Sequence, residues 1–199
     1  MSQRRLILIT GGARSGKSTF GQQIAEKSSS DVLFVATAQA GDADMAARIA
    51  QHQAERPAHW RTLETPQRVA AALHEIPAPP TVLLDCVTLW VTNLLLADWH
   101  EDGASRPDLH AAMVELEQLL DWYRQHSVVL IVVSNEVGLG IVPADPLTRT
   151  FRDWLGRFNQ RLAAEADEVY LLIAGLPVEL KSLALASVPH VPKGADDGV

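Results

Sequence analysis

The stretch that decides the fold is Leu6–Phe20, which reads LILITGGARSGKSTF. Its opening run, Leu6 to Ile9, is continuously apolar, as is typical of a buried strand, and the residues that follow Ser18 are compatible with a helix. Between the two, Gly11–Ser18 fits the pattern G-x-x-x-x-G-K-[ST] of the phosphate-binding loop. A strand, a glycine-bearing loop and a helix in this order predict a P-loop nucleotide-binding fold.

The residue types of this loop predict how it binds phosphate. Gly11 and Gly16 permit positive φ angles and let the backbone approach a phosphate closely. The backbone amides can then point inward at a helix N-terminus and form an anion nest. Lys17 supplies a positive charge for the β- and γ-phosphates, and the Ser18 hydroxyl can hold Mg²⁺. We therefore expect nucleotide contacts from the whole loop, Gly11, Gly12, Ala13, Arg14, Ser15, Gly16, Lys17 and Ser18.

Composition limits the class of protein. A chain of 199 residues, 47% of them apolar, has the size and composition of one globular domain. The net charge of −7 argues against a broad nucleic-acid surface, which needs a basic face. Cys86 is the single cysteine, so no intrachain disulfide can form and the reducing cytoplasm is the expected compartment. No apolar run reaches the roughly 18 residues of a membrane span, and the short run after the basic N-terminus does not fit a signal peptide.

Strands and helices are predicted to alternate along the rest of the chain. Apolar runs predict strands at residues 32–36, 59–64, 81–86, 127–134, 168–174 and 178–181. Periodicity predicts helices at 16–28, 45–56, 88–97 and 148–166, with Asp44 as the N-cap of the second. It also predicts a helix that starts at Thr65-Pro66 and a long helix that follows Asp108. Such alternation predicts an α/β fold with a mostly parallel central sheet flanked by helices and a short edge strand near the C-terminus. Residues 1–181 would form one catalytic domain, with a mobile loop at 98–107 and a loose tail at 182–199.

Polar residues at strand ends are candidates for the site, because ligands bind at the carboxyl ends of parallel strands. Thr37 and Gln39 follow one predicted strand. Asp85 ends another and fits the Walker-B pattern, in which a carboxylate holds Mg²⁺. A simple turn carboxylate is the alternative for Asp85, and Glu136, which follows the most apolar strand, is a rival for the same role.

His52 lies on the predicted helix at 45–56, where a histidine by itself is more often structural or exposed than catalytic. The chain lacks the N-K-x-D guanine motif of switch GTPases, and its length suits a small-molecule kinase. The residue types alone do not name the acceptor of the phosphoryl group.

Several blocks together carry a family resemblance. The specific blocks are Met45–Ile49 with His52 and Arg56-Pro57, and Asn135–Pro143, which reads NEVGLGIVP. The supporting blocks are Ile9–Ser18, Ala36–Gln39, Trp60–Thr62 with Glu64, Leu83–Cys86, Asn93–Leu95, and Phe151–Asp153 followed by Gly156 and Asn159–Ala164. Over about residues 6–181 the chain resembles the bifunctional adenosylcobinamide kinase / adenosylcobinamide-phosphate guanylyltransferase family of cobalamin biosynthesis. That family is similar to recombinase-type P-loop folds, and its members assemble as homotrimers.

The resemblance implies two reactions. ATP or GTP first phosphorylates the aminopropanol hydroxyl of adenosylcobinamide. GTP then transfers GMP to adenosylcobinamide phosphate through a GMP-histidine intermediate, which gives adenosylcobinamide-GDP and pyrophosphate. The histidine that closes the motif R-I-x-x-H aligns with His52, while Gln51 stands where some members have a second histidine. A neutral imidazole can attack the α-phosphorus, with Lys17 and Mg²⁺ stabilising the leaving pyrophosphate.

The resemblance also assigns the GTP contacts, which are Thr37, Ala38, Gln39, Gln53, Ala54, Glu55, Arg56, Glu64 and Asp85. Asp85 is then a nucleoside contact, whereas the Walker-B pattern makes it a Mg²⁺ ligand, and the sequence leaves both open. Because His52 lies on a helix, that helix must swing over the phosphate loop, with Arg48 or Arg56 neutralising the α-phosphate. A kinase without the second activity and a nucleotide sensor without turnover are the rival hypotheses.

Overall fold

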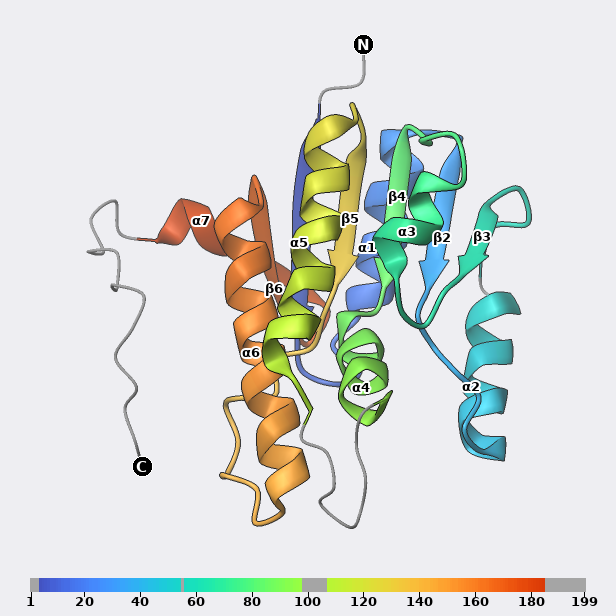
Figure 1. Ribbon diagram of the computed structural model, residues 1–199. Helices are drawn as coiled ribbons and strands as arrows, with labels where there is room; N and C mark the ends of the chain where they lie inside the picture. Colours follow the sequence, from blue (N-terminus) through green and yellow to red (C-terminus); the bar gives the residue numbers. More distant parts are fainter. Residues whose placement is uncertain (1–3, 55, 98–106, 185–199) are drawn as a thin grey trace.

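The computed structural model of the protein describes residues 4–54, 56–97 and 107–184, without the side chain at position 48. One seven-stranded sheet runs through it in the order β3-β2-β4-β5-β1-β6-β7 (Figure 1). The strands are β1 (Arg5–Gly11), β2 (Val32–Ala36), β3 (Arg61–Glu64), β4 (Thr81–Asp85), β5 (Val129–Val133), β6 (Glu168–Ile173) and β7 (Leu176–Glu179). β7 pairs antiparallel with β6, and all the other neighbours pair parallel. The carboxyl ends of β1 to β6 therefore share one edge of the sheet.

Helices cover both faces of this sheet, in agreement with the predicted α/β architecture. They are α1 (Lys17–Ser28), α2 (Ala43–Ala54), α3 (Val69–His74), α4 (Val87–Ala97), α5 (Leu109–Gln125), α6 (Pro146–Glu165) and α7 (Leu180–Leu183). α1 packs on one face, while α3, α4, α5 and α6 contribute to the core on the other. α2 stands away from both layers, close to the carboxyl end of β3 (Figure 1). In the ranges described, no helix combines the length and the apolarity that a membrane crossing needs.

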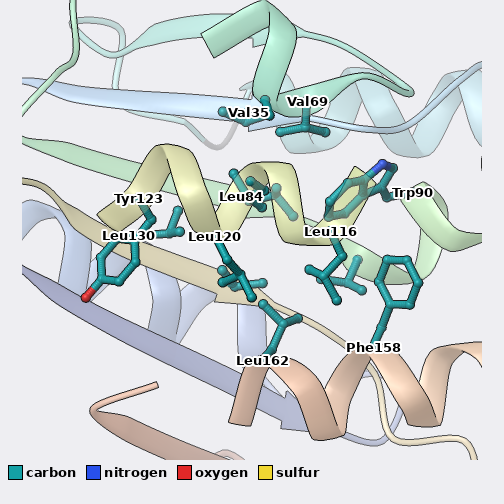
Figure 2. Packing of buried hydrophobic residues seen from close by; sticks show 14 of the residues in the cluster. Val35, Val69, Leu84, Trp90, Leu116, Leu120, Tyr123, Leu130, Phe158 and Leu162 are labelled. Carbon is teal, nitrogen blue, oxygen red and sulfur yellow. The ribbon is translucent and has the colours of Figure 1, made fainter. Parts of the chain in front are cut away.

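The central strands are apolar throughout because both of their faces are covered. Ile7 and Ile9 of β1 pack toward α1, and the alternate residues Leu6 and Leu8 pack toward the helices on the opposite face. The larger core lies on that opposite face, where α4, α5 and α6 meet the sheet (Figure 2). This core includes the buried Trp90 ring, which packs edge-to-face with Phe158 at 5.7 Å between ring centroids.

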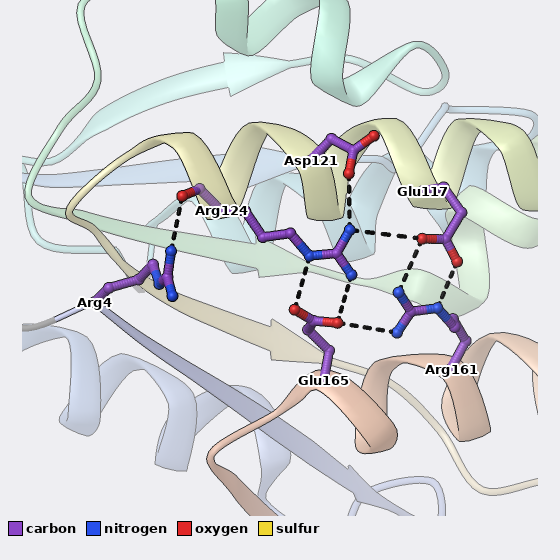
Figure 3. Close-up of polar contacts among 6 residues, drawn as sticks. All are labelled: Arg4, Glu117, Asp121, Arg124, Arg161 and Glu165. Atoms are coloured by element: carbon purple, nitrogen blue, oxygen red, sulfur yellow. Dashed lines mark hydrogen bonds and ion pairs between the residues drawn. The ribbon is translucent and has the colours of Figure 1, made fainter.

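Ion pairs join the outer surfaces of α5 and α6 (Figure 3). Arg124 of α5 donates two hydrogen bonds to Glu165 of α6, at 2.9 and 2.6 Å. Arg161 of α6 donates to both carboxylate oxygens of Glu117 on α5, at 2.5 and 2.9 Å. These side chains are partly exposed, so solvent screening limits each pair to roughly 1 kcal/mol or less.

Three predicted boundaries need correction. The helix predicted to start at Thr65-Pro66 starts at Val69, because Arg68 adopts the left-handed conformation with φ 54°. The Thr65 hydroxyl instead donates to the Gln67 carbonyl. Asp42, rather than Asp44, caps α2 by accepting from the Met45 amide at 2.7 Å.

The third correction concerns the C-terminus of the domain. The edge strand lies at Leu176–Glu179 rather than at 178–181, and a helical turn, α7, follows where the loose tail was predicted to begin. The Glu179 carboxylate caps that turn by accepting from the amides of Lys181 and Ser182. The rest of the predicted tail, and nearly all of the predicted mobile loop at 98–107, lie outside the described residues.

Candidate functional site

The phosphate loop connects β1 to α1 at the carboxyl edge of the sheet. Gly11 and Gly16 both have positive φ, 146° and 94°, as the sequence predicted. A Cβ at Gly11 would lie 2.4 Å from the Leu172 carbonyl oxygen of β6, so only glycine fits there. The turn between β6 and β7 also supports the loop, because the Gly175 amide donates to the Ser15 carbonyl at 3.0 Å. The loop is therefore shaped by the strand beside it as well as by its own glycines.

Lys17 begins α1 and is 8% exposed. Its ammonium donates to the Gly12 carbonyl at 2.6 Å and lies 3.4 Å from the Ser15 hydroxyl, so the charge is held within the curve of the loop. Burial lowers the pKa of Lys17, while Cys86 and Asp85 act in the opposite direction. The charge predicted for phosphate binding is thus in place at the loop.

Asp85 ends β4, two strands away from β1 in the sheet. Burial raises the pKa of its carboxyl group, and a hydrogen bond from Ser18 and the charges of His52, Arg56 and Lys17 oppose that rise. The Ser18 hydroxyl, in the first turn of α1, therefore lies beside the Asp85 carboxyl group at the end of β4. Hard oxygen donors of this kind suit Mg²⁺, which takes few protein ligands and completes its shell with phosphate and water. Within the described ranges, no three His, Cys, Asp or Glu side chains gather as a metal site built from protein alone.

His52 lies in the last turn of α2. It is exposed, and its charge opposes the rise that burial causes in the pKa of the Asp85 carboxyl group. None of the α2 side chains that the structure describes is buried. A helix with so few buried contacts opens or shifts at low free-energy cost.

Arg56 follows α2 and stacks on the sheet. Its guanidinium carbon lies 3.6 Å from the centroid of the Phe34 ring of β2. Its Nε is buried without a hydrogen-bond partner. Burial lowers the pKa of Arg56, and the charges of Asp85 and Glu64 oppose this. Gln53 donates to the Glu64 carboxylate at 3.1 Å, so three of the predicted GTP contacts gather where α2 meets β3.

Thr37 holds two strand ends together. It is fully buried, and its hydroxyl donates to the Cys86 carbonyl at 2.7 Å and accepts from the Cys86 amide at 3.1 Å. Asn93 of α4 donates to the Thr37 carbonyl at 2.7 Å and to the Pro66 carbonyl at 3.0 Å. Thr37 therefore fixes the end of β4 beside Asp85. Asn93 lies in one of the blocks that carry the family resemblance, but no contact was predicted for it from the sequence, although a lone amide inside an apolar helix is a signal of buried hydrogen bonds.

The other predicted residues divide into three groups. Ala38 is half-buried and Gln39 is exposed, both in the segment that leaves β2 at the site edge. Ala54 is exposed at the end of α2. Glu55 and the side chain of Arg48 lie outside the described part of the chain.

Glu136 is the alternative to Asp85 for the strand-end carboxylate. It follows β5, the strand that lies between β4 and β1 in the sheet. Its amide donates to the Gly11 carbonyl at 3.1 Å, and its carboxylate accepts from the Gly138 amide at 2.5 Å. The Glu136 side chain thus shapes its own loop, whereas Asp85 meets Ser18. Of the two carboxylates, Asp85 is the one that lies beside Ser18 of the phosphate loop.

Comparison with known proteins identifies relatives across the whole domain. The family described as "Cobinamide kinase / cobinamide phosphate guanyltransferase" matches residues 7–180. The bifunctional adenosylcobalamin biosynthesis protein CobP of Pseudomonas aeruginosa is 46% identical over 175 residues, which cover 87% of this chain and 96% of that protein. The bifunctional adenosylcobalamin biosynthesis protein CobU of Escherichia coli is 44% identical over 184 residues, covering 88% and 99%.

A solved structure supports the fold independently. An ATPase from the type III secretion system of pathogenic bacteria superimposes with a TM-score of 0.55 at 15% identity, over 93% of this chain and 61% of that one. At this identity the similarity supports the P-loop fold alone.

Proposed function

The chain belongs to the cobinamide kinase / cobinamide phosphate guanyltransferase family, a family of bifunctional enzymes of adenosylcobalamin biosynthesis, and we propose that it performs both steps at one site. The first step is phosphorylation of adenosylcobinamide by ATP or GTP. The second is transfer of GMP from GTP to adenosylcobinamide phosphate, with release of pyrophosphate.

The phosphate loop supports the first step. Phosphoryl transfer depends mainly on positioning and on electrostatic stabilisation of the phosphates. The buried Lys17 ammonium provides the charge, and the loop amides provide hydrogen-bond donors at the start of α1. Ser18 and Asp85 have the oxygen donors to hold a Mg²⁺ ion, which when bound neutralises phosphate charge.

One observation carries the second step: His52, in the last turn of α2, lies close enough to Asp85 for its charge to act on that carboxyl group, on which Arg56 and Lys17 also act. In the proposed reaction, a ring nitrogen of His52 attacks the α-phosphorus of GTP. The bond from that phosphorus to the pyrophosphate oxygen breaks, which leaves GMP bound to the imidazole. A phosphate oxygen of the acceptor then attacks the same phosphorus, and the P–N bond breaks to restore His52.

We propose that α2 closes over the phosphate loop when GTP binds. The absence of buried side chains among those described on α2 supports such a movement, since little packing opposes it. Arg56 or Arg48 would then neutralise the α-phosphate. Limited proteolysis tests this closure: GTP should protect residues 40–60, and unchanged cleavage would refute it.

We assign the nucleoside contacts to the segments that follow β2 and α2 and to the end of β3. Thr37, Ala38 and Gln39 follow β2, Gln53 and Ala54 end α2, and Arg56 lies just beyond that helix. The Glu64 carboxylate can accept from the N1–H and N2–H₂ groups of guanine, in exchange for its present hydrogen bond from Gln53.

Covalent labelling tests the proposal. The protein is incubated with Mg²⁺ and GTP carrying label at the α-phosphate, then denatured. We expect acid-labile, alkali-stable label on the chain, which His52→Asn should abolish. His59→Asn is the matched control, because His59 is also exposed and lies in the segment after α2. Label that persists in His52→Asn would contradict the assigned nucleophile.

A kinase without guanylyltransferase activity is the remaining alternative. It predicts phosphorylation of adenosylcobinamide without label on the wild-type chain. By the family resemblance we also propose a cytoplasmic homotrimer, which light scattering of the purified protein would test.

A further inference from the structure

The connection between β5 and α6 carries large apolar side chains into water. Leu139 is 88% exposed, Ile141 97% and Val142 61%. Single exposed apolar residues are ordinary, but three within four positions are a local concentration that favours a binding surface. We call these three residues the apolar loop.

The base of this loop is fixed to the phosphate loop. The Glu136 amide donates to the Gly11 carbonyl at 3.1 Å, and the Ser134 amide donates to the Ile9 carbonyl at 2.8 Å. The Asn135 side chain donates to the Thr88 hydroxyl at 2.8 Å. The position of the loop base relative to a bound phosphate is therefore set by backbone and amide hydrogen bonds.

The far end of the loop is fixed as well. Arg149 of α6 donates to the carbonyls of Pro143 and Ala144 at 2.8 and 2.6 Å. Asp145 then caps α6 by accepting from the Thr148 amide at 2.7 Å. With both ends anchored, the exposed apolar side chains are presented on a held loop rather than on a free segment.

The position of the loop suggests what it binds. β5 lies between β4, which ends in Asp85, and β1, which leads into the phosphate loop. The proposed nucleoside contacts lie farther along the edge, at β2, β3 and α2. A molecule that receives a group from the bound nucleotide must reach the phosphates, and the apolar loop borders that approach.

We propose that Leu139, Ile141 and Val142 form the acceptor subsite, in which they contact an apolar face of the corrin macrocycle. This inference rests on the proposed function, which makes a cobinamide the acceptor. The macrocycle is large and carries its reacting group on a short aminopropanol arm, so its body must lie beside the phosphates. An apolar surface anchored to the phosphate loop meets that requirement, and a second copy of the chain is the competing occupant.

The double variant Leu139→Ser/Ile141→Ser tests the subsite. The expected result is a KM for adenosylcobinamide at least tenfold higher in the kinase assay, with an unchanged KM for the nucleotide. GMP labelling of the chain needs no acceptor and should remain at the wild-type level. Leu183→Ser is the matched control, because Leu183 is also an exposed apolar residue, 68% exposed on α7. α7 lies away from the phosphate loop, since Lys181 of α7 donates to the Ala166 carbonyl just before β6 begins.

The outcomes separate this inference from the proposed function. Wild-type protein that neither phosphorylates adenosylcobinamide nor takes up label would refute the function. Equilibrium dialysis of adenosylcobinamide against wild type and double variant then still tests the subsite, which predicts weaker binding by the variant. Equal KM values, or equal binding, would overturn the subsite. Light scattering tests the competing occupant. If the variant forms a smaller assembly but keeps the acceptor KM, the apolar loop contacts another copy of the chain, and the proposed subsite is overturned.

Discussion

Replacement of Thr37 by valine tests whether this residue joins β2 to β4. Valine keeps the shape of the buried side chain but removes the hydroxyl, which leaves the Cys86 amide and carbonyl without the bonds of 3.1 and 2.7 Å. An unsatisfied, largely buried polar group costs about 1–3 kcal/mol. For two such groups, partly reached by water, we expect Thr37→Val to lose about 2–4 kcal/mol of unfolding free energy.

Urea unfolding followed by tryptophan fluorescence measures this loss. Thr37→Ser retains the hydroxyl and should lose only about 1 kcal/mol for the missing methyl group. Thr62→Val is the second control, because Thr62 is exposed on β3, the strand next to β2, and its replacement should stay within about 0.5 kcal/mol of wild type. If Thr37→Val is no less stable than Thr37→Ser, the two bonds to Cys86 do not stabilise the fold and the reasoning fails.

Three further predictions follow from contacts and charges described above. Gly11→Ala should abolish nucleotide binding and destabilise the fold by roughly 2 kcal/mol or more, because the added Cβ would meet the Leu172 carbonyl. Gly12→Ala is the control: its Cβ would enter open space, so calorimetry should show almost normal nucleotide binding. Asp85→Asn should stabilise the nucleotide-free protein while abolishing activity. Burial raises the pKa of Asp85 in the folded state, so the ionised carboxylate destabilises the fold. This destabilisation is absent below the unfolded-state pKa of about 3.9 and grows as the pH rises above it. The gain in melting temperature should therefore be larger at pH 8 than at pH 4, and a gain independent of pH would contradict the assignment. A double-mutant cycle of Arg124→Ala and Glu165→Ala should give a coupling below about 1 kcal/mol that shrinks in high salt, since water reaches both side chains.

Most of the sheet could be predicted because its strands are buried on both faces. Continuous apolar runs such as Leu6–Ile9 are distinctive, and the glycine spacing that follows correctly predicted positive φ angles at Gly11 and Gly16. The start of α3 could not be predicted, because it depends on a contact distant in the sequence. The Arg68 amide donates to the buried Glu115 carboxylate of α5, and that bond takes the place of a local cap. The sequence of residues 65–69 alone therefore does not predict the contact with Glu115.

The candidate site divides in the same way. Lys17 and Ser18 follow from one local motif, and the gathering of Asp85 with them follows from the parallel order of the strands. The hydrogen bonds of Asn93 to two carbonyls depend on how α4 packs against the end of β2. The apolar periodicity of the sequence does not predict that packing. The stacking of Arg56 on Phe34 likewise requires β2 and the end of α2 to meet in space.

The support that β6 and the turn after it give to the phosphate loop has a consequence for how the protein is made. Gly11 and Ser15 leave the ribosome early, but Leu172 and Gly175, which hold them, are synthesised near the end of the chain. β1 also pairs with β5 and β6, so its first partner strand is not synthesised until residue 129. Pairings of such large sequence separation form late and slowly. We expect nascent chains that stop before β6 to be unable to hold GTP, so that nucleotide capture would report the completion of synthesis.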